Sequence, residues 1–463
     1  MPAPPQFAVV FFTHYNSIKR RTPALRDALS AALERRLPAD AVAACAPARG
    51  LFGTPAGGGS LAELDPSQVP DAADGGAARA RSHGVSVLLG RLPGARVQAF
   101  ALPAVGPPPT LRSAVSELAG AGWLPASLLL LMAPPASSAA SVSALGKLEL
   151  LARSHPWLPV AGGVASMQNG LLCFRGSSDA VPTAAAFAGL LVSRPAAPLS
   201  RPLVAAALAA EGQLAFGPVA ADLALRPLGV SPDGSSLGVE VHSLGGLWEA
   251  LVEDQEGDTT PSLGVWLAPR TAAASPTNSY AAAAAAGNAL RLDAQKAMID
   301  MEANQPIILA LSEAVQTKAL LSRLESDPGL TLCGQLLRFN AAAVRAELQR
   351  SLPGLAALRP PPPALLPPPC GSGLVAVACC AKGLQLHDEQ GAEAAALQAA
   401  LGSGTAVCGA FMDGEIGHSI PSGLSTLRVA PADEAAVAQR REQGQAGDIR
   451  LSGFTSQLLL LGA

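Results

Sequence analysis

The chain has 463 residues, a formal net charge of −3 and a charged fraction of only 14%. This length predicts about two to four domains, with a core large enough to need no disulfide or metal. The negative charge and the 4% aromatic content argue against a nucleic-acid partner, since phosphate contacts need basic patches and base stacking needs aromatic rings. No apolar run reaches the roughly eighteen residues that span a bilayer, so no membrane partner is expected.

The seven cysteines are scattered along the chain, odd in number and without a C-x-x-C pair. This usage favours a reducing compartment and predicts no zinc site. The first residues show neither the charged and apolar regions of a secretion signal nor an Arg- and Ser-rich leader. A cytoplasmic location is therefore expected, with the nucleus left open, and no cofactor or metal is predicted.

Hydrophobic periodicity predicts alternating strands and helices from the start of the chain. A buried strand is expected at 7–13, an amphipathic helix at 22–36, a second strand at 41–46 and a glycine-rich turn at 50–59. Strands at 85–90 and 96–102 flank Pro93-Gly94, which favours a hairpin-like break between them.

A pattern of strand, helix, strand and small-residue turn occurs twice, which predicts a diverged internal repeat, with chance similarity as the alternative. Its two copies are expected at 128–163, ending in Gly162-Gly163, and at 374–414, ending in Asp413-Gly414. The fold class is therefore α/β (α+β), with mixed β-sheets covered by helices. The Pro-rich break at 194–203 predicts two domains, 7–200 and 201–463, and the Pro-rich stretch 359–369 predicts an exposed loop.

Two segments near the C-terminus resemble the C-terminal FIST domain. AVACCAKG at 376–383 is similar to a strand that ends in Cys-x-x-Arg-Gly, with Cys379 at the cysteine position and Lys382 in place of the arginine. GAFMDGEIG at 409–417 is similar to Gly-Phe-Phe-x-x-Gly-Glu-Ile-Gly. The segment 160–166, VAGGVAS, resembles a turn in the N-terminal FIST domain. The predicted domains thus correspond to two FIST halves.

This resemblance implies a non-catalytic recognition module for sensing or signal transduction. The expected partner is a small polar ligand, such as an amino acid, or a protein substrate. In eukaryotes, FIST domains also follow an F-box and present substrates to a ubiquitin ligase. Only six residues precede the first predicted strand, so that role would need an F-box from elsewhere. The residues expected to bind the ligand or partner lie in the resembling segments: Gly414, Glu415, Gly417, Cys379, Lys382, Gly162 and Gly163.

Each candidate residue also has a structural interpretation. The glycines around Glu415 suit a positive-φ turn and close strand approach as well as a ligand mouth. Cys379 and Lys382 can meet only if their strand ends by residue 380, and a buried, inert Cys379 is the alternative. The glycines likewise predict a loop at His418, and His387-Asp388-Glu389 predicts a solvated turn. GSSLG at 234–238 precedes a predicted strand, whereas a nucleophile elbow needs a helix there, so no hydrolase is expected.

Overall fold

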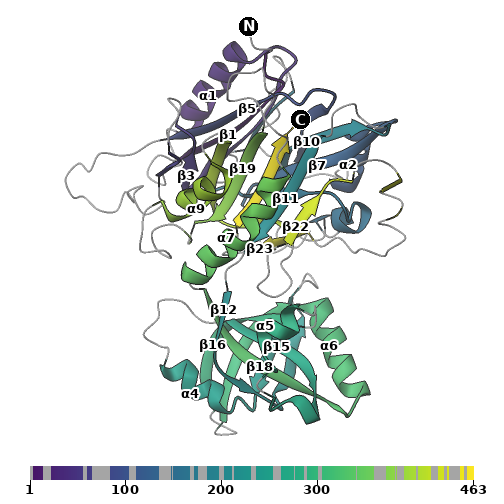
Figure 1. Cartoon of the computed structure of the whole chain (residues 1–463), viewed down its shortest axis with the longest axis vertical. Coiled ribbons are helices and arrows are strands. Elements are labelled where there is room, and N and C mark those ends of the chain that lie inside the picture. The colour runs from purple at the N-terminus through teal and green to yellow at the C-terminus, as the bar shows by residue number, and fades with distance from the viewer. Residues whose placement is uncertain are drawn as a thin grey trace, which may run out of the picture.

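Three β-sheets with their helices form the upper lobe of the protein, and a fourth sheet forms the lower lobe (Figure 1). The computed structural model describes residues 4–13, 22–55, 60–64, 84–103, 111–134, 147–148, 150–166, 171–175, 185–197, 203–210, 213–230, 236–253, 262–275, 277–285, 289–300, 305–339, 341–358, 372–380, 382, 391–402, 405–418, 426–431, 435–436, 439, 449–452 and 456–462. Among the helices in these ranges, none is both long and apolar enough to cross a bilayer.

The strands of the upper lobe come from both ends of the chain. In spatial order, the four-stranded sheet contains β5 (Val85–Gly90), β1 (Phe7–Thr13), β2 (Val42–Ala48) and β9 (Leu172–Arg175). The six-stranded sheet contains β23 (Ile449–Ser452), β21 (Glu415–His418), β8 (Val160–Val164), β7 (Trp123–Met132), β10 (Ala185–Pro195) and β6 (Arg96–Pro103). The upper seven-stranded sheet contains β22 (Thr426–Val429), β11 (Val204–Ala210), β24 (Ser456–Gly462), β19 (Ser372–Cys379), β20 (Ala406–Met412), β3 (Gly50–Gly53) and β4 (Ala62–Leu64).

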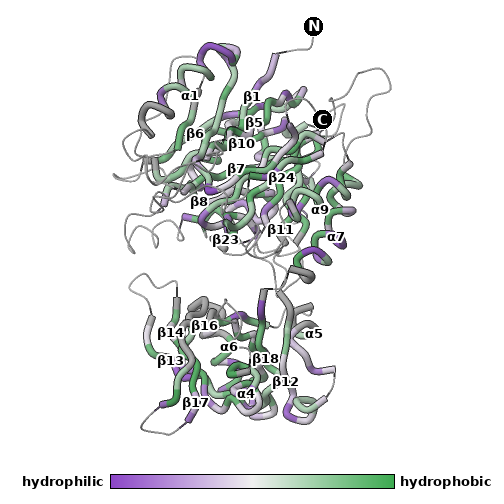
Figure 2. The backbone as a smooth tube through the Cα atoms, turned by 90° about the vertical axis from the view of Figure 1, so that its left-hand side faces the viewer, coloured by the Kyte–Doolittle hydropathy of each residue, from purple (hydrophilic) through white to green (hydrophobic). Residues whose placement is uncertain are grey.

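The inner faces of these three sheets share one hydrophobic core. Alternate residues of β1, β7, β10, β19 and β24, such as Val9, Leu129, Leu190, Val375 and Leu459, are buried together in it. Figure 2 shows hydrophobic strands such as β7 and β10 running through this lobe. Because strand side chains alternate between the two faces, the outer face of each sheet needs its own cover.

Helices supply that cover. Leu29 and Leu33 of α1 (Thr22–Arg36) pack against the outer face of the four-stranded sheet. The six-stranded sheet packs against α2 (Leu111–Ala119) and the helical residues 150–154. The upper seven-stranded sheet packs against α7 (Ala341–Ala357) and α9 (Ala392–Leu401). The predicted class, mixed sheets with helices, is therefore confirmed.

The lower lobe is formed by residues 213–339, between β11 and α7 of the upper lobe. Its antiparallel sheet contains, in spatial order, β12 (Gln213–Ala220), β18 (Leu330–Phe339), β15 (Ser262–Pro269), β16 (Ala289–Asp300), β17 (Gln305–Glu313), β14 (Ser236–His242) and β13 (Ala224–Val230). The helices described beside it are α4 (Gly246–Glu253), α5 (Tyr280–Ala285) and α6 (Ala314–Ser326). Residues 270–272 add a single 3₁₀ turn.

Strand pairing groups the chain differently from the predicted division at residue 200. β3 of the first predicted domain pairs with β20 of the second, and β8 pairs with β21. The segment that forms a sheet by itself is 213–339. Residues before and after this segment therefore fold together in the upper lobe.

Three local predictions within the first 200 residues differ from the structure. β5 pairs with β1 and β6 pairs with β10, so these two strands form no hairpin with each other. The first part of the predicted turn at 50–59 is β3, because its apolar Leu51 and Phe52 pack into two cores. Gly162 and Gly163 lie within β8 instead of in a turn.

Candidate functional site

The three parallel strand pairs of the upper lobe are the centre of its architecture. β1 pairs with β2, β7 with β8, and β19 with β20, one pair in each sheet. Each pair is connected by a segment that contains helical residues, and two of these pairs are the predicted repeats. Their common origin by duplication stays a prediction.

The carboxyl ends of β2, β8 and β20 are joined by backbone hydrogen bonds in a closed cycle. Arg49 N–H donates to Phe411 O at 2.8 Å, Asp413 N–H to Val164 O at 3.1 Å, and Ser166 N–H to Pro47 O at 3.0 Å. Carboxyl ends of parallel strands are where α/β proteins commonly place their ligands. The residues that follow these strands therefore form the candidate site.

An Arg–Asp ion pair lies at this junction. Arg49 Nε donates to Asp413 Oδ1 at 2.8 Å and Nη2 donates to Oδ2 at 3.2 Å, which makes the pair bidentate. The two side chains remain 38% and 27% exposed, so each has further hydrogen-bonding capacity toward solvent. The junction thus offers a cation and an anion side by side.

A pair of adjacent cysteines ends β19 next to this ion pair. Cys379 is buried and Cys380 is partly exposed. A hydrogen bond from the Cys379 thiol lowers the pKa of the Cys380 thiol, whereas burial and the carboxyl groups of Asp413 and Glu415 act to raise that pKa. The Arg49 guanidinium adds to the lowering. Cys380 is therefore in electrostatic contact with both members of the ion pair.

The structure brings the two predicted glycine segments together. Glu415 is opposite Gly163 and Ile416 is opposite Gly162 in the antiparallel pairing of β21 with β8. Val164 N–H also donates to Gly414 O at 2.8 Å. Gly162, Gly163, Gly414 and Glu415 are thus parts of one assembly beside the Arg49–Asp413 pair.

Close approach explains three of the predicted glycines. A Cβ on Gly162 would be 1.7 Å from Leu130 O, and one on Gly163 would be 2.8 Å from Gly414 O. A Cβ on Gly417 would be 1.9 Å from Gln457 Oε1. Gly417 lies in β21, so the structure favours close strand approach over a positive-φ turn at this position.

Lys382 lies away from solvent in a buried polar cluster. Its side chain is 0% exposed, and Nζ donates to Ser456 Oγ at 2.8 Å and lies 3.5 Å from Glu393 Oε1. The Ser456 hydroxyl in turn donates to the Glu393 carboxylate at 3.3 Å. These contacts join α9 to β24, so Lys382 has a structural role in this arrangement. β19 does end at Cys379, which meets the condition stated for a Cys379–Lys382 contact.

Glu415 and His418 belong to strand β21, which corrects the predicted loop. Both are buried, with Glu415 0% and His418 2% exposed. His418 Nε2 accepts a hydrogen bond from Val160 N–H at 3.2 Å, which joins β21 to the start of β8. Both ends of this strand thus hold polar side chains inside the protein.

The remaining candidate features add nothing to this site within the part of the chain that the structure describes. His387-Asp388-Glu389 and the Pro-rich stretch 359–369 lie outside the described residues. Ser236 begins strand β14, so no helix follows the G-x-S-x-G segment. Within the described ranges, no cluster of three or more His, Cys, Asp or Glu residues could hold a metal.

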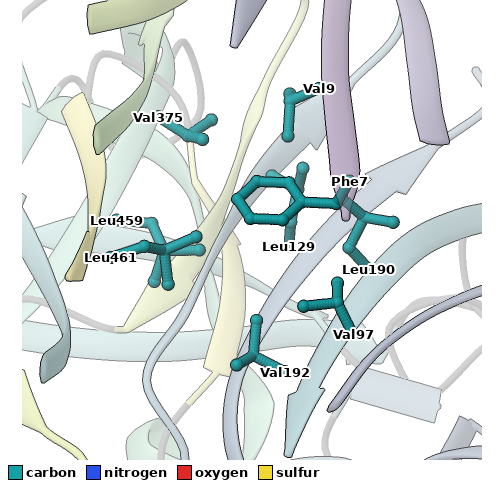
Figure 3. A pocket seen from close by; sticks show the side chains of 9 residues that line it. All are labelled: Phe7, Val9, Val97, Leu129, Leu190, Val192, Val375, Leu459 and Leu461. Carbon is teal, nitrogen blue, oxygen red and sulfur yellow. The ribbon is translucent and has the colours of Figure 1, made fainter. Parts of the chain in front are cut away.

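A small void in the shared core is apolar on every side (Figure 3). It measures about 10 Å³ and is lined by Phe7, Val9, Val97, Leu129, Leu190, Val192, Val375, Leu459 and Leu461. A cavity of this size holds about one water at most, and a water needs polar partners that these side chains lack. The void is a packing feature of the core.

A comparison with models of known protein families gives no match for this chain, and no curated protein matches its sequence. The resemblance to the FIST domains therefore stays a proposal.

Arg49, Ser166, Cys380 and Asp413 were not among the predicted binding residues. A signal for three of them exists in the sequence, because Arg49, Cys380 and Asp413 each follow directly after a short buried strand. The first residue after a parallel strand lies at the ligand-binding edge of its sheet. The rule identifies Arg49 only once β2 is seen to end at Ala48, because the predicted strand ends at residue 46.

Proposed function

We propose that this chain is a non-catalytic recognition module that binds a small polar ligand at the carboxyl ends of β2, β8 and β20. The observation that carries the proposal is the partly exposed Arg49–Asp413 pair at the junction. A ligand with both a carboxylate and an ammonium group complements such a pair, since the carboxylate can contact Arg49 and the ammonium can contact Asp413. A free amino acid has this chemistry, which agrees with the ligand class implied by the FIST resemblance.

The test is a thermal-shift and calorimetric screen of the purified chain with the free amino acids. A ligand that fits the junction is expected to raise the Tm of wild type but not of Arg49→Met or Asp413→Asn. The matched control is Arg270→Met, which removes the exposed Arg270–Asp222 pair of the lower lobe. The proposal would be overturned if binding survives both junction substitutions. It would also be overturned if no amino acid in the panel raises the Tm of wild type or gives a heat of binding.

A second candidate function is recognition of a protein substrate, including the role of substrate-recognition subunit in an SCF-type ubiquitin ligase acting in proteasomal degradation. It is favoured by the edge strand β5, where Val85, Val87 and Leu89 are 55%, 47% and 54% exposed. An edge strand with a row of exposed apolar side chains can accept an extended segment of another protein.

The substrate hypothesis predicts that Val87→Lys abolishes capture of a specific protein while Arg49→Met leaves its capture intact. The ligase version adds that the chain co-purifies with a cullin adaptor and that the captured protein accumulates when cullin activation is inhibited. Capture that is unaffected by Val87→Lys, or a captured protein whose level does not respond, would count against this candidate.

A further inference from the structure

The three sheets of the upper lobe share one plan of strand pairing. Each contains one parallel pair, which is β1–β2, β7–β8 or β19–β20. In each sheet, a later strand pairs antiparallel with the first strand of the parallel pair: β5 with β1, β10 with β7, and β24 with β19. β5, β10 and β24 therefore hold equivalent positions.

Two of these three equivalent strands have a further neighbour. β6 pairs antiparallel with β10, and β11 pairs antiparallel with β24. β5, in contrast, is the outermost strand of its sheet in the part of the chain that the structure describes. The position beside β5 thus corresponds to the positions that β6 and β11 occupy in the other two sheets.

A helix covers each of these added strands from outside. Leu111 of α2 is buried in one cluster with Phe100 and Leu102 of β6. Leu348 of α7 is buried in one cluster with Leu208 of β11. In the other two sheets, this position therefore contains a strand together with a helix that packs on it.

The outward-facing side chains of the equivalent strands differ in the same way. Val85, Val87 and Leu89 alternate with the inward-facing residues of β5, and they are 55%, 47% and 54% exposed. The outward-facing Leu191 of β10 and Leu460 of β24 are both 0% exposed, in the clusters that contain α2 and α7. The apolar row of β5 is thus a surface that the other two sheets cover.

We propose that β5 is the docking strand for a β-strand and an amphipathic helix of another polypeptide, placed as β6 with α2 and β11 with α7 are placed. The docked strand runs antiparallel to β5, as β6 and β11 run against their neighbours. The inference deepens the second candidate function, on which it rests for β5 as the contact surface. It is separate from the ligand site at the junction.

β6 and β11 define the chemistry of this partner. The side chains that they turn toward the shared core are small or β-branched: Val97, Ala99, Ala205 and Ala207. The side chains that they turn toward the covering helix include large apolar ones: Phe100, Leu102 and Leu208. β5 itself carries no charged residue, so a charge on the partner strand would be buried without a counter-charge from β5. The partner strand therefore alternates small and large apolar residues.

The test uses the full chain and a fluorescent synthetic peptide of residues 96–119, which contains β6 and α2, as the probe. Saturable binding is expected in fluorescence anisotropy. Val87→Lys should weaken it by at least about tenfold, because the docked helix would bury the new charge. The matched control is Leu228→Lys, since Leu228 is 54% exposed on β13, the outermost strand of the lower sheet. This control should leave the Kd unchanged.

Peptide variants and hydrogen exchange examine the mode of docking. The peptide with Phe100→Asp and Leu102→Asp should not bind. Amides of β5 should gain protection from exchange, whereas those of β13 should not. A photo-cross-linker at peptide position 96 should react near Gly90, because Arg96 is opposite Ser193 at the end of β10 in the equivalent pairing.

A fusion keeps the test decisive if the free peptide binds weakly. Residues 96–119 joined by a flexible linker to the N-terminus of the full chain have a raised effective concentration at β5. The fusion should show the same protection of β5, and Val87→Lys within it should remove that protection.

The inference is overturned if neither the peptide nor the fusion protects β5, or if Leu228→Lys weakens binding as much as Val87→Lys. A wild-type dimer that dissociates on Val87→Lys would assign β5 to a second copy of this chain and would also overturn it. Capture of a specific protein that depends on Val87, with β5 unprotected by peptide and fusion, would remove this inference and leave the second candidate function standing.

Discussion

The side chain of Gln457 lies against the α-carbon of Gly417, and a Cβ added there would be 1.9 Å from Gln457 Oε1. Gln457 belongs to β24 in the upper seven-stranded sheet, and Gly417 belongs to β21 in the six-stranded sheet. The contact therefore fixes the separation of two sheets that contribute to the shared core. Gln457 is 0% exposed, so its side chain has little room to move.

Gly162→Ala is expected to destabilise the protein more than Gly417→Ala. The new methyl at 162 would meet the backbone oxygen of Leu130, which cannot move aside, whereas the one at 417 meets the end of a side chain. Overpacking costs about 1–3 kcal/mol and occasionally more, so we expect at least about 3 kcal/mol at 162 and about 1–3 kcal/mol at 417. Urea unfolding followed by circular dichroism measures both values.

Two variants control this prediction. Gly238→Ala, in β14, places a methyl no closer than 3.5 Å to its neighbours Leu228 and Gly229 in β13 and should cost less than about 1 kcal/mol. Adding Gln457→Ala to Gly417→Ala should make the double variant more stable than the sum of the two single changes predicts. Strict additivity would show that the two residues do not constrain each other.

The Arg49–Asp413 pair is expected to contribute little to folding. Both side chains are partly exposed, and exposed ion pairs are worth about 0.2–1 kcal/mol in double-mutant cycles. A cycle of Arg49→Met and Asp413→Asn should give a coupling energy within this range. A coupling above about 2 kcal/mol would assign the pair a structural role and weaken its use as evidence for a binding site.

Lys382→Met is expected to destabilise the protein by about 3–5 kcal/mol, because it leaves the Glu393 carboxylate buried without its cation. Adding Glu393→Gln should recover much of this loss, since the uncompensated charge is then removed. Arg226→Met removes a side chain that is 73% exposed and lies 3.5 Å from Glu240 Oε2, and it should cost less than about 1 kcal/mol. Equal losses for the Lys382 single and double variants would contradict the charge-pair explanation.

Stability is expected to fall above pH 9 because of buried thiols. Burial raises the pKa of Cys408 from 9.0 to about 12, and burial also raises the pKa of Cys45. The stabilisation contributed by these buried thiols is fully present at pH values below the pKa of a cysteine in the unfolded chain. Above it, the unfolded chain releases a proton that the folded chain keeps, so each such thiol lowers the unfolding free energy by about 1.4 kcal/mol per pH unit.

The measurement is the unfolding free energy between pH 8 and about pH 11 for wild type and Cys408→Ala. The variant should show a shallower decline, by about 1.4 kcal/mol per pH unit, because one titrating thiol is gone. Cys380→Ala is the control, since the pKa of that thiol is lowered instead of raised. Parallel declines for wild type and Cys408→Ala would contradict the assignment.

Local patterns in the sequence were sufficient to predict several elements. The strand Phe7–Thr13 and the helix Thr22–Arg36 have the predicted bounds, and β19, α9 and β20 follow the strand, helix and strand order predicted for 374–414. Hydrophobic periodicity is a local property, so each segment carries its own signal. The mixed-sheet class followed from the order of these elements.

Only the tertiary structure decided which strands are neighbours. β5 and β6 are close in sequence yet lie in different sheets, and Gly162 joins Ile416 across the pairing of β8 with β21. Apolar strands of similar composition can pair in many arrangements. The packing of three sheets around one core selects among them.

The candidate site, too, was predictable in part from local sequence and depends in part on the tertiary structure. The sequence by itself pointed to both glycine segments and placed a turn at Asp413-Gly414. The sequence alone could not show that Arg49 contacts Asp413. These residues are 364 positions apart, and they meet only because the strands that precede them pair with other strands of the upper lobe. The ion pair and the environment of Cys380 exist only once β2, β8, β19 and β20 end at one place, which depends on contacts that no local pattern encodes.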